Sequence, residues 1–226
     1  MKSESENFLD VPIYGTKEVA RYVGVPYQTL RYWIRGKEPI PPLVTLACIE
    51  PPRLSFMNLL ECHMLSAMRA FYSLRIPRVR KALATAREIF PSSHPLVDLP
   101  FLTDNVDLFV ERLPDEIVNL SKGGQLGIKE LLQVHLQRIE RDPSGLLTFF
   151  PFVEERSARE PKVILMNPAI AFGKPVIAGS GISTAVITAR FHARESISDL
   201  AKEYERSEKD IEEAVRWESE SRLLAA

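Results

Sequence analysis

The chain has 226 residues, of which 45% are hydrophobic and 26% charged; this excludes a disordered protein, because disordered chains lack the apolar residues that offset ordering entropy. The net charge of −1 is unevenly distributed: residues 1–90 hold 13 Lys and Arg against 8 Asp and Glu, and the remainder holds 16 against 22. A basic first part suits nucleic acid, and chance variation of surface charge is the alternative. No apolar run approaches the roughly 18 residues that cross a bilayer, and the first residues lack a secretory pattern, so we predict a cytoplasmic protein.

The first readable pattern, over residues 14–36, predicts two short helices joined by a glycine turn. Thr16 is placed to cap a helix over 17–23, and a glycine ends it. Pro26 then opens a second helix that runs to about Arg35. Apolar residues at helical spacing would pack the helices together: Val19, Ala20 and Val23 in the first, and Leu30, Trp33 and Ile34 in the second.

Burial of that apolar stripe turns the other side of the second helix outward. Such a helix fits the major groove, where Gln reads adenine edges and Arg reads guanine edges, while hydroxyls and further basic residues hold phosphates. An ordinary helical hairpin with a basic surface is the alternative. With phosphate contacts from the first helix and from a following wing, the predicted DNA-binding residues are Lys17, Arg21, Tyr27, Gln28, Thr29, Arg31, Tyr32, Arg35, Lys37 and Arg53.

After the second helix the chain is rich in proline, which forbids a continuous helix. Residues 43–49 and 54–56 are typical of short strands around a turn over 50–53, as in a β-wing. Apolar residues at helical spacing then predict two amphipathic helices, over 57–72 and 78–90. Methionines on the first of these are expected to fill the core.

The middle of the chain mixes helix and strand patterns. Alternating apolar residues over 101–120 predict a β-hairpin that ends at Gly123-Gly124. A helix over 127–141 and two strands, over 146–152 and 162–166, are expected to follow. The region could supply a dimer interface or a partner-binding surface, and the residues do not separate these two roles.

The end of the chain, from residue 167, predicts a second helical unit. A loop rich in Gly and Pro leads to a helix over 184–193. Two S-x-x-D patterns, at Ser196 and Ser207, cap two further helices. The expected core residues of this unit are Val186, Ile187, Phe191, Ile211, Ala214, Val215 and Trp217.

The loop before these helices is predicted to be a rigid turn. Glycines at 173, 179 and 181 permit backbone conformations that other residues resist. Pro175 stiffens Val176 and Ile177 as an extended piece that could pair with a strand. Anion binding is a weak alternative, because the GxxxxGK[ST] pattern is absent.

The outward face of the last helices is acidic, so phosphate would repel it. Such a face suits a basic surface on a partner protein or a symmetric contact between two copies, and both readings stay open. The acidic residues are Glu203, Glu205, Glu208, Glu212 and Glu213.

The runs YGTKEVA (14–20), GVP (24–26) and TLRYW (29–33) resemble the winged helix-turn-helix of MerR-type regulators, and the wing and two following helices match in order. This resemblance implies that the first part of the chain binds DNA. The chain lacks the long dimerisation helix and the effector-binding cysteines of that architecture, so metal or drug sensing is not implied.

The run GKPVIAG (173–179) resembles the G-x-P-V-I-x-G loop of small antitoxins of the domain-of-unknown-function 433 family, in which the loop precedes a three-helix unit. Many members place Thr-Arg-Ile-Pro after the second glycine, whereas this chain has Ser180-Gly181-Ile182-Ser183, so the contact of that arginine is not carried over. Combined, the two resemblances are similar to VapB-type antitoxins, which implies a PIN-like ribonuclease toxin as partner. The second match continues through Ile182, Leu200, Ala201, Tyr204, Ser207, Ile211, Ala214 and Trp217.

The sequence offers no enzyme motif. The four histidines are scattered, HExxH and GxSxG are absent, and His135 lies on an apolar helix face, where a core histidine is expected. Cys48 and Cys62 are expected to be buried thiols without a disulfide. We therefore predict no catalysis, cofactor or metal. The acidic residues that could ligate magnesium lack mutual spacing: Asp104, Asp107, Asp142, Glu154 and Glu155.

Together these patterns predict a mainly α fold with small β elements. The expected domains are a MerR-like winged helix-turn-helix over 1–92, an α+β middle region over 93–166 and a C-terminal helical, antitoxin-type domain over 167–226. The predicted protein is an antitoxin and homodimeric repressor of its own operon that binds double-stranded DNA and neutralises a PIN-like ribonuclease toxin. Alternatives are a MerR-like regulator without a toxin, whose C-terminal domain serves oligomerisation, and an adaptor or enzyme of unrecognised type.

Overall fold

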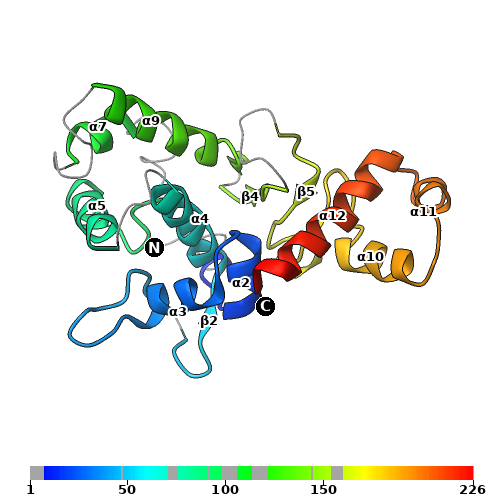
Figure 1. The fold of residues 1–226 in the computed structure, drawn as a ribbon, viewed down its shortest axis with the longest axis horizontal. Helices are drawn as coiled ribbons and strands as arrows, with labels where there is room; N and C mark the ends of the chain where they lie inside the picture. The colour runs from blue at the N-terminus through cyan, green and yellow to red at the C-terminus, as the bar shows by residue number, and fades with distance from the viewer. Residues whose placement is uncertain are drawn as a thin grey trace.

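The fold is mainly helical, and the described residues hold three two-stranded antiparallel sheets. A computed structural model describes residues 8–46, 48–70, 76–90, 92–97, 106–113, 122–143, 145–153 and 160–225. Figure 1 shows the N-terminal helices around the buried helix α4 (Phe56–Ala70), and the C-terminal helices as a group at one end of the molecule. The predicted fold class is confirmed.

Two short helices, α2 (Thr16–Tyr22) and α3 (Tyr27–Arg35), form the predicted corner. The apolar stripe of each helix faces the other, and Val19, Ala20, Leu30 and Trp33 are completely buried. Gly24 adopts a left-handed φ of 64° in the turn between them. The apolar spacing read from the sequence therefore identifies both helices and their contact.

The helix α2 begins at Thr16 and is capped by Gly15, so the prediction that Thr16 caps it was wrong. The backbone N–H of Gly15 donates to Glu18 Oε2 at 2.7 Å. The Glu18 carboxylate, at the third position of the helix, thus accepts from the backbone N–H of the capping residue, as in a capping box.

The segment after α3 returns to the end of that helix. The backbone N–H groups of Leu43 and Val44 both donate to the carbonyl of Trp33, at 2.7 and 3.2 Å. Lys37 and Ile40 pair across the tight turn between them. This loop therefore satisfies a carbonyl that the end of a helix leaves open.

The predicted wing is shorter than expected and paired differently. The strand β2 (Arg53–Leu54) pairs with β1 (Tyr14–Gly15), the two residues that precede α2. The predicted strand over 43–49 is wrong among its described residues, because Leu43 and Val44 bond to Trp33 instead and Cys48 contributes only a single bridge to Arg53. Phe56, predicted as strand, begins α4.

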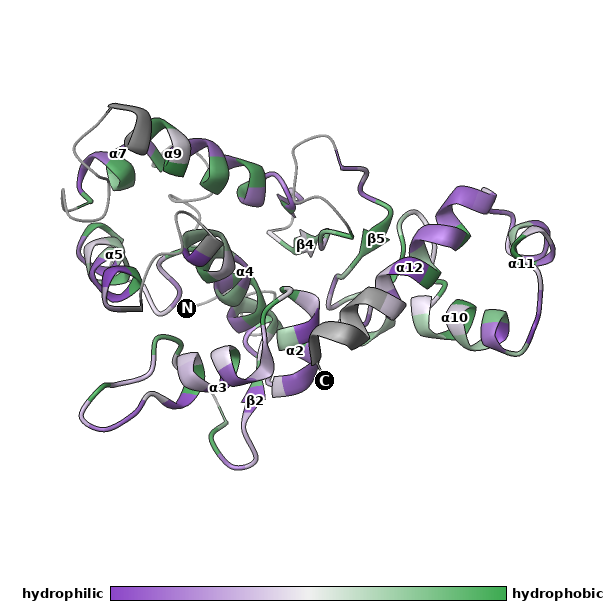
Figure 2. Ribbon diagram, viewed as in Figure 1, coloured by the Kyte–Doolittle hydropathy of each residue, from purple (hydrophilic) through white to green (hydrophobic). Residues whose placement is uncertain are grey.

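Two long helices follow, as predicted. Nearly all of α4 is buried, and Figure 2 shows hydrophobic residues along it. The helix α5 (Ile76–Ile89) packs against α4 and buries Val79, Leu83 and Ala86. The predicted end of the first helix, at 71–72, lies outside the described residues.

A histidine joins three separate parts of this N-terminal half. His94 Nδ1 lies 2.8 Å from Glu61 Oε2, and its Nε2 lies 3.1 Å from Asp10 Oδ1. Burial alone would lower the pKa of His94, but the hydrogen bonds and charges of these carboxylates outweigh burial and raise it. The raised pKa favours an imidazolium that links the start of the chain to α4.

The hairpin predicted over 101–120 is wrong where the structure describes it. Residues Val106–Glu111 form the helix α7, which buries Val106, Phe109 and Val110 at helical spacing. Residues 101–105 and 114–120 lie outside the described residues. The stretch is too short for its period to separate helix from strand.

The helix α9 (Lys122–Leu136) packs on α4 and α7. It begins earlier than predicted and contains Gly123 and Gly124, which therefore do not end an element. It also ends earlier, since β3 (Ile139–Arg141) pairs with β4 (Leu147–Phe149). Arg138, between α9 and β3, donates to the carbonyls of Phe150 and Pro151, at 2.7 and 3.1 Å.

The C-terminal unit follows its predicted order. The strand β6 (Val176–Ile177) pairs with β5 (Ile164–Leu165), as the stiffened Pro175 segment predicted. The turn η2 (Ala171–Gly173) precedes β6. Three helices then follow: α10 (Thr184–His192), α11 (Ile197–Glu203) and α12 (Glu208–Ala225).

Fewer residues of this unit are buried in its core than expected. Ile187, Ile211, Ala214 and Trp217 are buried and Val215 is half-buried, but Val186 and Phe191 are 48% and 37% exposed. The helix α10 packs on α12 through one stripe, in which two buried threonines, Thr184 and Thr188, replace the expected apolar residues. Side chains beside that stripe face outward.

The described chain repeats one set of corner hydrogen bonds, at α2–α3 and at α11–α12; the turn between α10 and α11 has it as well, with Glu195 N–H donating to Arg190 O and Arg194 at φ 73°. In the first, Val25 N–H donates to Ala20 O, and Leu30 N–H to Pro26 O. In the second, between α11 and α12, Arg206 N–H donates to Ala201 O in the same relation. Glu205, with φ 52°, takes the place of Gly24. The C-terminal unit therefore holds a second helix-turn-helix corner.

Gly36 offers a test of the turn after α3. Its φ is +67°, and an added Cβ would lie 2.3 Å from Ile40 O and 2.7 Å from Pro41 C. Gly36→Ala is expected to lower the free energy of unfolding by about 2 kcal/mol or more, because neither backbone atom can move away cheaply. Urea denaturation measures it.

Gly181→Ala is the matched control, because a Cβ there meets nothing within 4 Å. It should change stability by less than about 0.5 kcal/mol. Equal losses in both variants would contradict the close approach at Gly36.

Candidate nucleic-acid interface

The outward side of α3 presents most of the residues predicted to bind DNA. Gln28, Arg31 and Arg35 are exposed, and Lys37 is exposed just beyond the helix. Tyr27, Thr29 and Tyr32 are half-buried beside them. The structure therefore brings these seven residues onto one surface, opposite the buried Leu30, Trp33 and Ile34.

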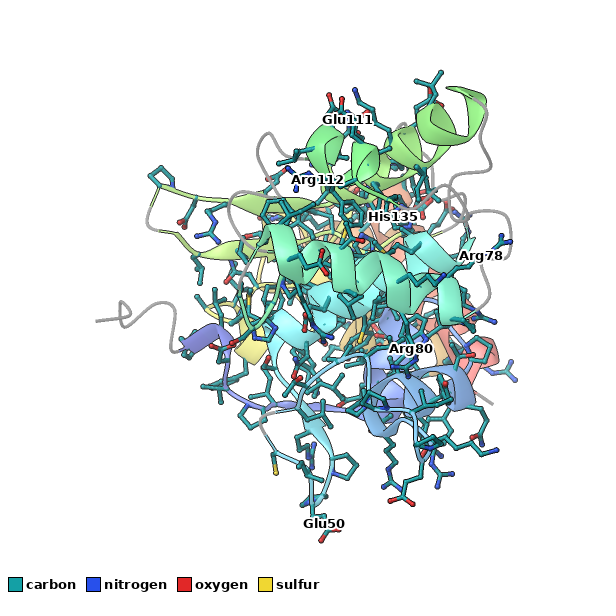
Figure 3. The ribbon with its side chains drawn as sticks, turned by 90° about the vertical axis from the view of Figure 1, so that its left-hand side faces the viewer. Glu50, Arg78, Arg80, Glu111, Arg112 and His135 are labelled. Carbon is teal, nitrogen blue, oxygen red and sulfur yellow. The ribbon has the colours of Figure 1, made fainter. Side chains whose placement is uncertain are left out.

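Two further predicted residues flank this surface. Lys17 is exposed on α2, with its Nζ 5.8 Å from the centre of the Tyr27 ring. Arg53 is exposed at the base of the wing, where it pairs with Gly15. Glu50 lies at the tip of the wing (Figure 3), so the tip itself carries a negative charge.

The tenth predicted residue, Arg21, has an intramolecular partner instead. Its Nη1 donates to Glu218 Oε2 of α12 at 2.9 Å, and the Glu218 side chain is 2% exposed. The Arg21 guanidinium also lies over the Tyr22 and Trp217 rings, which stack 5.5 Å apart. In this conformation the charge of Arg21 is directed at α12 and not at the surface of α3.

Sequence reasoning missed this contact, because 197 residues separate the two charges. Glu218 also accepts a hydrogen bond from Thr184 Oγ1 at 2.7 Å, so it joins α10 to α2. Buried carboxylates require such partners. The only signal in the sequence is a glutamate one residue beyond the buried Trp217 on a helix with an apolar stripe.

A second contact between the two units lies at the start of α2. The Tyr14 hydroxyl donates to the carbonyl of Gly173 at 2.9 Å, and burial raises the pKa of Tyr14 far above its ordinary value. Lys174 Nζ lies 2.6 Å from Glu18 Oε1. Burial alone would raise the pKa of Glu18, but its bonds to Lys174 and to the Gly15 N–H outweigh burial and lower it. The loop of the C-terminal unit thereby covers the N-terminus of α2.

The acidic face predicted for the C-terminal unit is only partly free. Glu205, Glu208 and Glu212 are exposed. Glu203 pairs with Arg190, and Glu213 is buried and pairs with Arg216, so the prediction that Glu213 is exposed was wrong. The second corner is still acidic where the first is basic.

The acidic residues considered as magnesium ligands do not come together in the part of the chain that the structure describes. No group of three or more His, Cys, Asp or Glu residues there could hold a metal ion. Asp107 pairs with Lys129, and Asp142 accepts from the Leu146 N–H; Asp104, Glu154 and Glu155 lie outside the described residues.

His135 is buried as predicted, with its ring 5.0 Å from that of Phe152. Cys62 is fully buried, and burial raises the pKa of its thiol. Cys48 is only half-buried, which corrects the prediction of two buried thiols. Among the helices that the structure describes, none has both the length and the apolar character needed to span a membrane.

Comparison with known proteins identifies the C-terminal part. Residues 164–217 match the model of the family described as "Protein of unknown function (DUF433)". The chain therefore contains a DUF433 region. This region includes the strands β5 and β6 and the helices α10 and α11, and it ends at Trp217 in α12.

Two proteins of Mycobacterium tuberculosis (strain ATCC 25618 / H37Rv) are similar along most of the chain. One, named "Putative antitoxin VapB45", is 27% identical over 89% of this chain and 91% of its own length. Another, named "Uncharacterized protein Rv2308", is 28% identical over 96% of this chain and 94% of its own. The similarity thus covers both the DUF433 region and the helices before it.

A solved structure has the same fold. The crystal structure of Rv2018 from Mycobacterium tuberculosis superposes with a TM-score of 0.70 over 92% of this chain and 99% of that chain, at 23% identity. The arrangement of N-terminal helices, middle region and DUF433 region is therefore one that a natural protein adopts.

The Arg21–Glu218 pair gives a prediction for stability. Glu218→Ala should lower the free energy of unfolding by about 2–4 kcal/mol, because it leaves a largely desolvated guanidinium without its acceptor and leaves the Thr184 hydroxyl only the more distant Pro175 carbonyl, at 3.4 Å. A double-mutant cycle with Arg21→Ala should give a coupling energy above about 1 kcal/mol.

Glu140→Ala is the control, since Glu140 pairs with Lys162 where the side chains are 55% and 36% exposed. It should cost less than about 1 kcal/mol. If Glu218→Ala is as mild as Glu140→Ala, the pair does not join the two units.

Proposed function

We propose that this protein is an antitoxin that binds double-stranded DNA through the outward side of α3 and represses its own operon. The observation that carries the DNA-binding part is the composition of that side. Gln28, Arg31 and Arg35 are exposed there, and α3 contains no acidic residue. Such a surface suits both base edges in the major groove and phosphates.

The elements around α3 support a MerR-like winged helix-turn-helix. The corner α2–α3 is followed by a short wing that pairs β2 with β1, and then by two helices, α4 and α5. This order agrees with the resemblance of the corner sequence to MerR-type regulators. In such an arrangement the second helix of the corner enters the groove and the wing lies along the backbone.

A homodimer is part of the proposal. A helix of nine residues contacts few base pairs, so one copy would discriminate poorly among sequences. Two copies that read half-sites about one helical turn apart would multiply the discrimination.

The proposed second partner is a toxin, of the PIN-like ribonuclease class. The name of the similar VapB45 protein and the DUF433 region support an antitoxin role. The exposed Glu205, Glu208 and Glu212 of the second corner offer negative charge to a basic RNA-binding surface. We place toxin binding on this C-terminal unit.

Substitution of the two arginines tests DNA binding. Arg31→Ala and Arg35→Ala should each weaken binding to a duplex of the DNA upstream of the gene by about tenfold, because each removes a charge-assisted contact. Gel-shift titration at two salt concentrations measures the loss. A phosphate contact should also lower the slope of log K against log salt by about 1.

Lys202→Ala serves as control, because Lys202 is exposed on α11, which lies at the other end of the molecule from α3 (Figure 1), and the change also removes one positive charge. It should leave the affinity unchanged. Wild-type protein that does not bind the duplex, or arginine variants that bind as well as Lys202→Ala, would overturn the proposal.

Co-expression with the product of the adjacent gene tests the toxin partnership. A stable complex with reduced ribonuclease activity is expected, and a charge-reversed Glu208→Lys/Glu212→Lys variant should bind the toxin at least tenfold less tightly. Normal DNA binding without any such complex would point to a regulator whose C-terminal unit only assembles the oligomer.

A further inference from the structure

An arginine next to α3 has an unsatisfied hydrogen-bonding edge. Arg80 of α5 lies with its guanidinium carbon 5.8 Å from the centre of the Tyr32 ring. Its Nε and Nη2 atoms are buried and have no hydrogen-bond partner. Figure 3 shows Arg80 between α5 and α3. Burial of guanidinium N–H groups without acceptors is costly, so their presence calls for a missing partner.

Other arginines of the described chain use the same edge. Arg138 donates from Nε and Nη2 to the carbonyls of Phe150 and Pro151. Arg190 donates from Nε to Glu195 Oε1, and its Nη2 bonds to the second oxygen of that carboxylate. In the part of the chain that the structure describes, Arg80 alone has both atoms buried and unpaired.

The geometry of this edge defines the ligand. Nε–H and Nη2–H point the same way and match two oxygens of one carboxylate or phosphate group. None of the described carboxylates pairs with Arg80, and Tyr32 beside it belongs to the proposed DNA-binding surface. A backbone phosphate of the bound duplex supplies such an oxygen pair.

On the α2 flank of α3, Lys17 is exposed, but the other polar groups are occupied within the protein. The Arg21 guanidinium pairs with Glu218. The backbone N–H of Gly15, at the N-terminus of α2, donates to Glu18, and Glu18 also pairs with Lys174. On the α5 flank, Arg78 is exposed one turn before Ala82, and Arg80 lies over Tyr32. The α5 side therefore adds positive charge for a phosphate backbone to that of the exposed Lys17 and Arg53.

We propose that Arg80 is a phosphate-binding residue, which turns its Nε–Nη2 edge onto the DNA backbone when α3 enters the groove. The inference rests on the proposed DNA binding and adds a contact outside the corner and the wing. The stem of arginine adopts several staggered rotamers, so the turn costs little, and it ends the unpaired burial of the edge.

Arg80→Gln tests this contact by gel shift on two duplexes, the DNA upstream of the gene and a scrambled sequence of equal length. Affinity should fall by about tenfold on both, because a phosphate contact is indifferent to sequence, and the salt slope should fall by about 1. Arg80→Lys keeps the charge but lacks the paired edge, so it should retain the salt slope with a smaller loss of affinity.

Arg87→Ala is the matched control on the same helix. Arg87 also carries one positive charge, but its Nη2 donates to Leu43 O within the protein. It should leave the salt slope unchanged. Thermal unfolding of Arg80→Gln should match wild type, since no described hydrogen bond is lost.

The outcomes separate the two proposals. Wild-type protein that ignores both duplexes overturns DNA binding and the role of Arg80 together. If Arg31→Ala lowers the affinity for DNA and Arg80→Gln does not, the Arg80 contact alone is overturned. The same holds if Arg87→Ala lowers the affinity as much as Arg80→Gln does. Should Arg80→Gln fail to fold, Arg80→Lys decides: affinity equal to wild type overturns the contact.

Discussion

The packing of α3 on α2 sets the orientation of α3 and the path of the chain that follows it. Leu30 and Trp33 are completely buried against Val19 and Ala20, so the rotation of α3 about its own axis has no freedom. The same packing aims the Trp33 carbonyl at the backbone of Leu43 and Val44, which sets where the wing begins. The polar residues of α3 then face outward because the apolar ones cannot.

Comparison of the corners α2–α3 and α11–α12 shows that this backbone arrangement is independent of surface charge. Both turns use the same hydrogen bonds and one residue of positive φ, which is Gly24 in the first and Glu205 in the second. The outward residues differ in charge: Arg31 and Arg35 are exposed on α3, whereas Glu208 and Glu212 are exposed beside Lys209 on α12. The fold thus specifies where a ligand surface lies, and a few exposed side chains specify what it attracts.

Local patterns predicted the helices well and the pairing of segments poorly. Apolar spacing identified α3, and the S-x-x-D pattern identified α11, whose Ser196 Oγ accepts from the Asp199 N–H at 3.1 Å. The segment Val106–Glu111 was misread because six residues satisfy both periods. The pairing of β2 with β1 and the Arg21–Glu218 bond join residues that are distant in sequence, so no local pattern predicts them. The unpaired edge of Arg80 depends on the lack of an acceptor around it, which a local pattern cannot predict either.

The bond between Arg21 and Glu218 also ties the two ends of the protein thermodynamically. The helix α12 cannot be displaced from α2 without exposing Trp217 and separating this ion pair. A protein that pulls on α12 must therefore either drag the α2–α3 corner with it or do work against that contact. Because coupling free energies are reciprocal, DNA that holds α2 in place would resist the same displacement by an equal amount. Occupancy at one end would then be reported at the other through the Arg21–Glu218 salt bridge and the stacked Tyr22–Trp217 pair, beside the contacts of Tyr14 and Glu18 with the loop of the C-terminal unit.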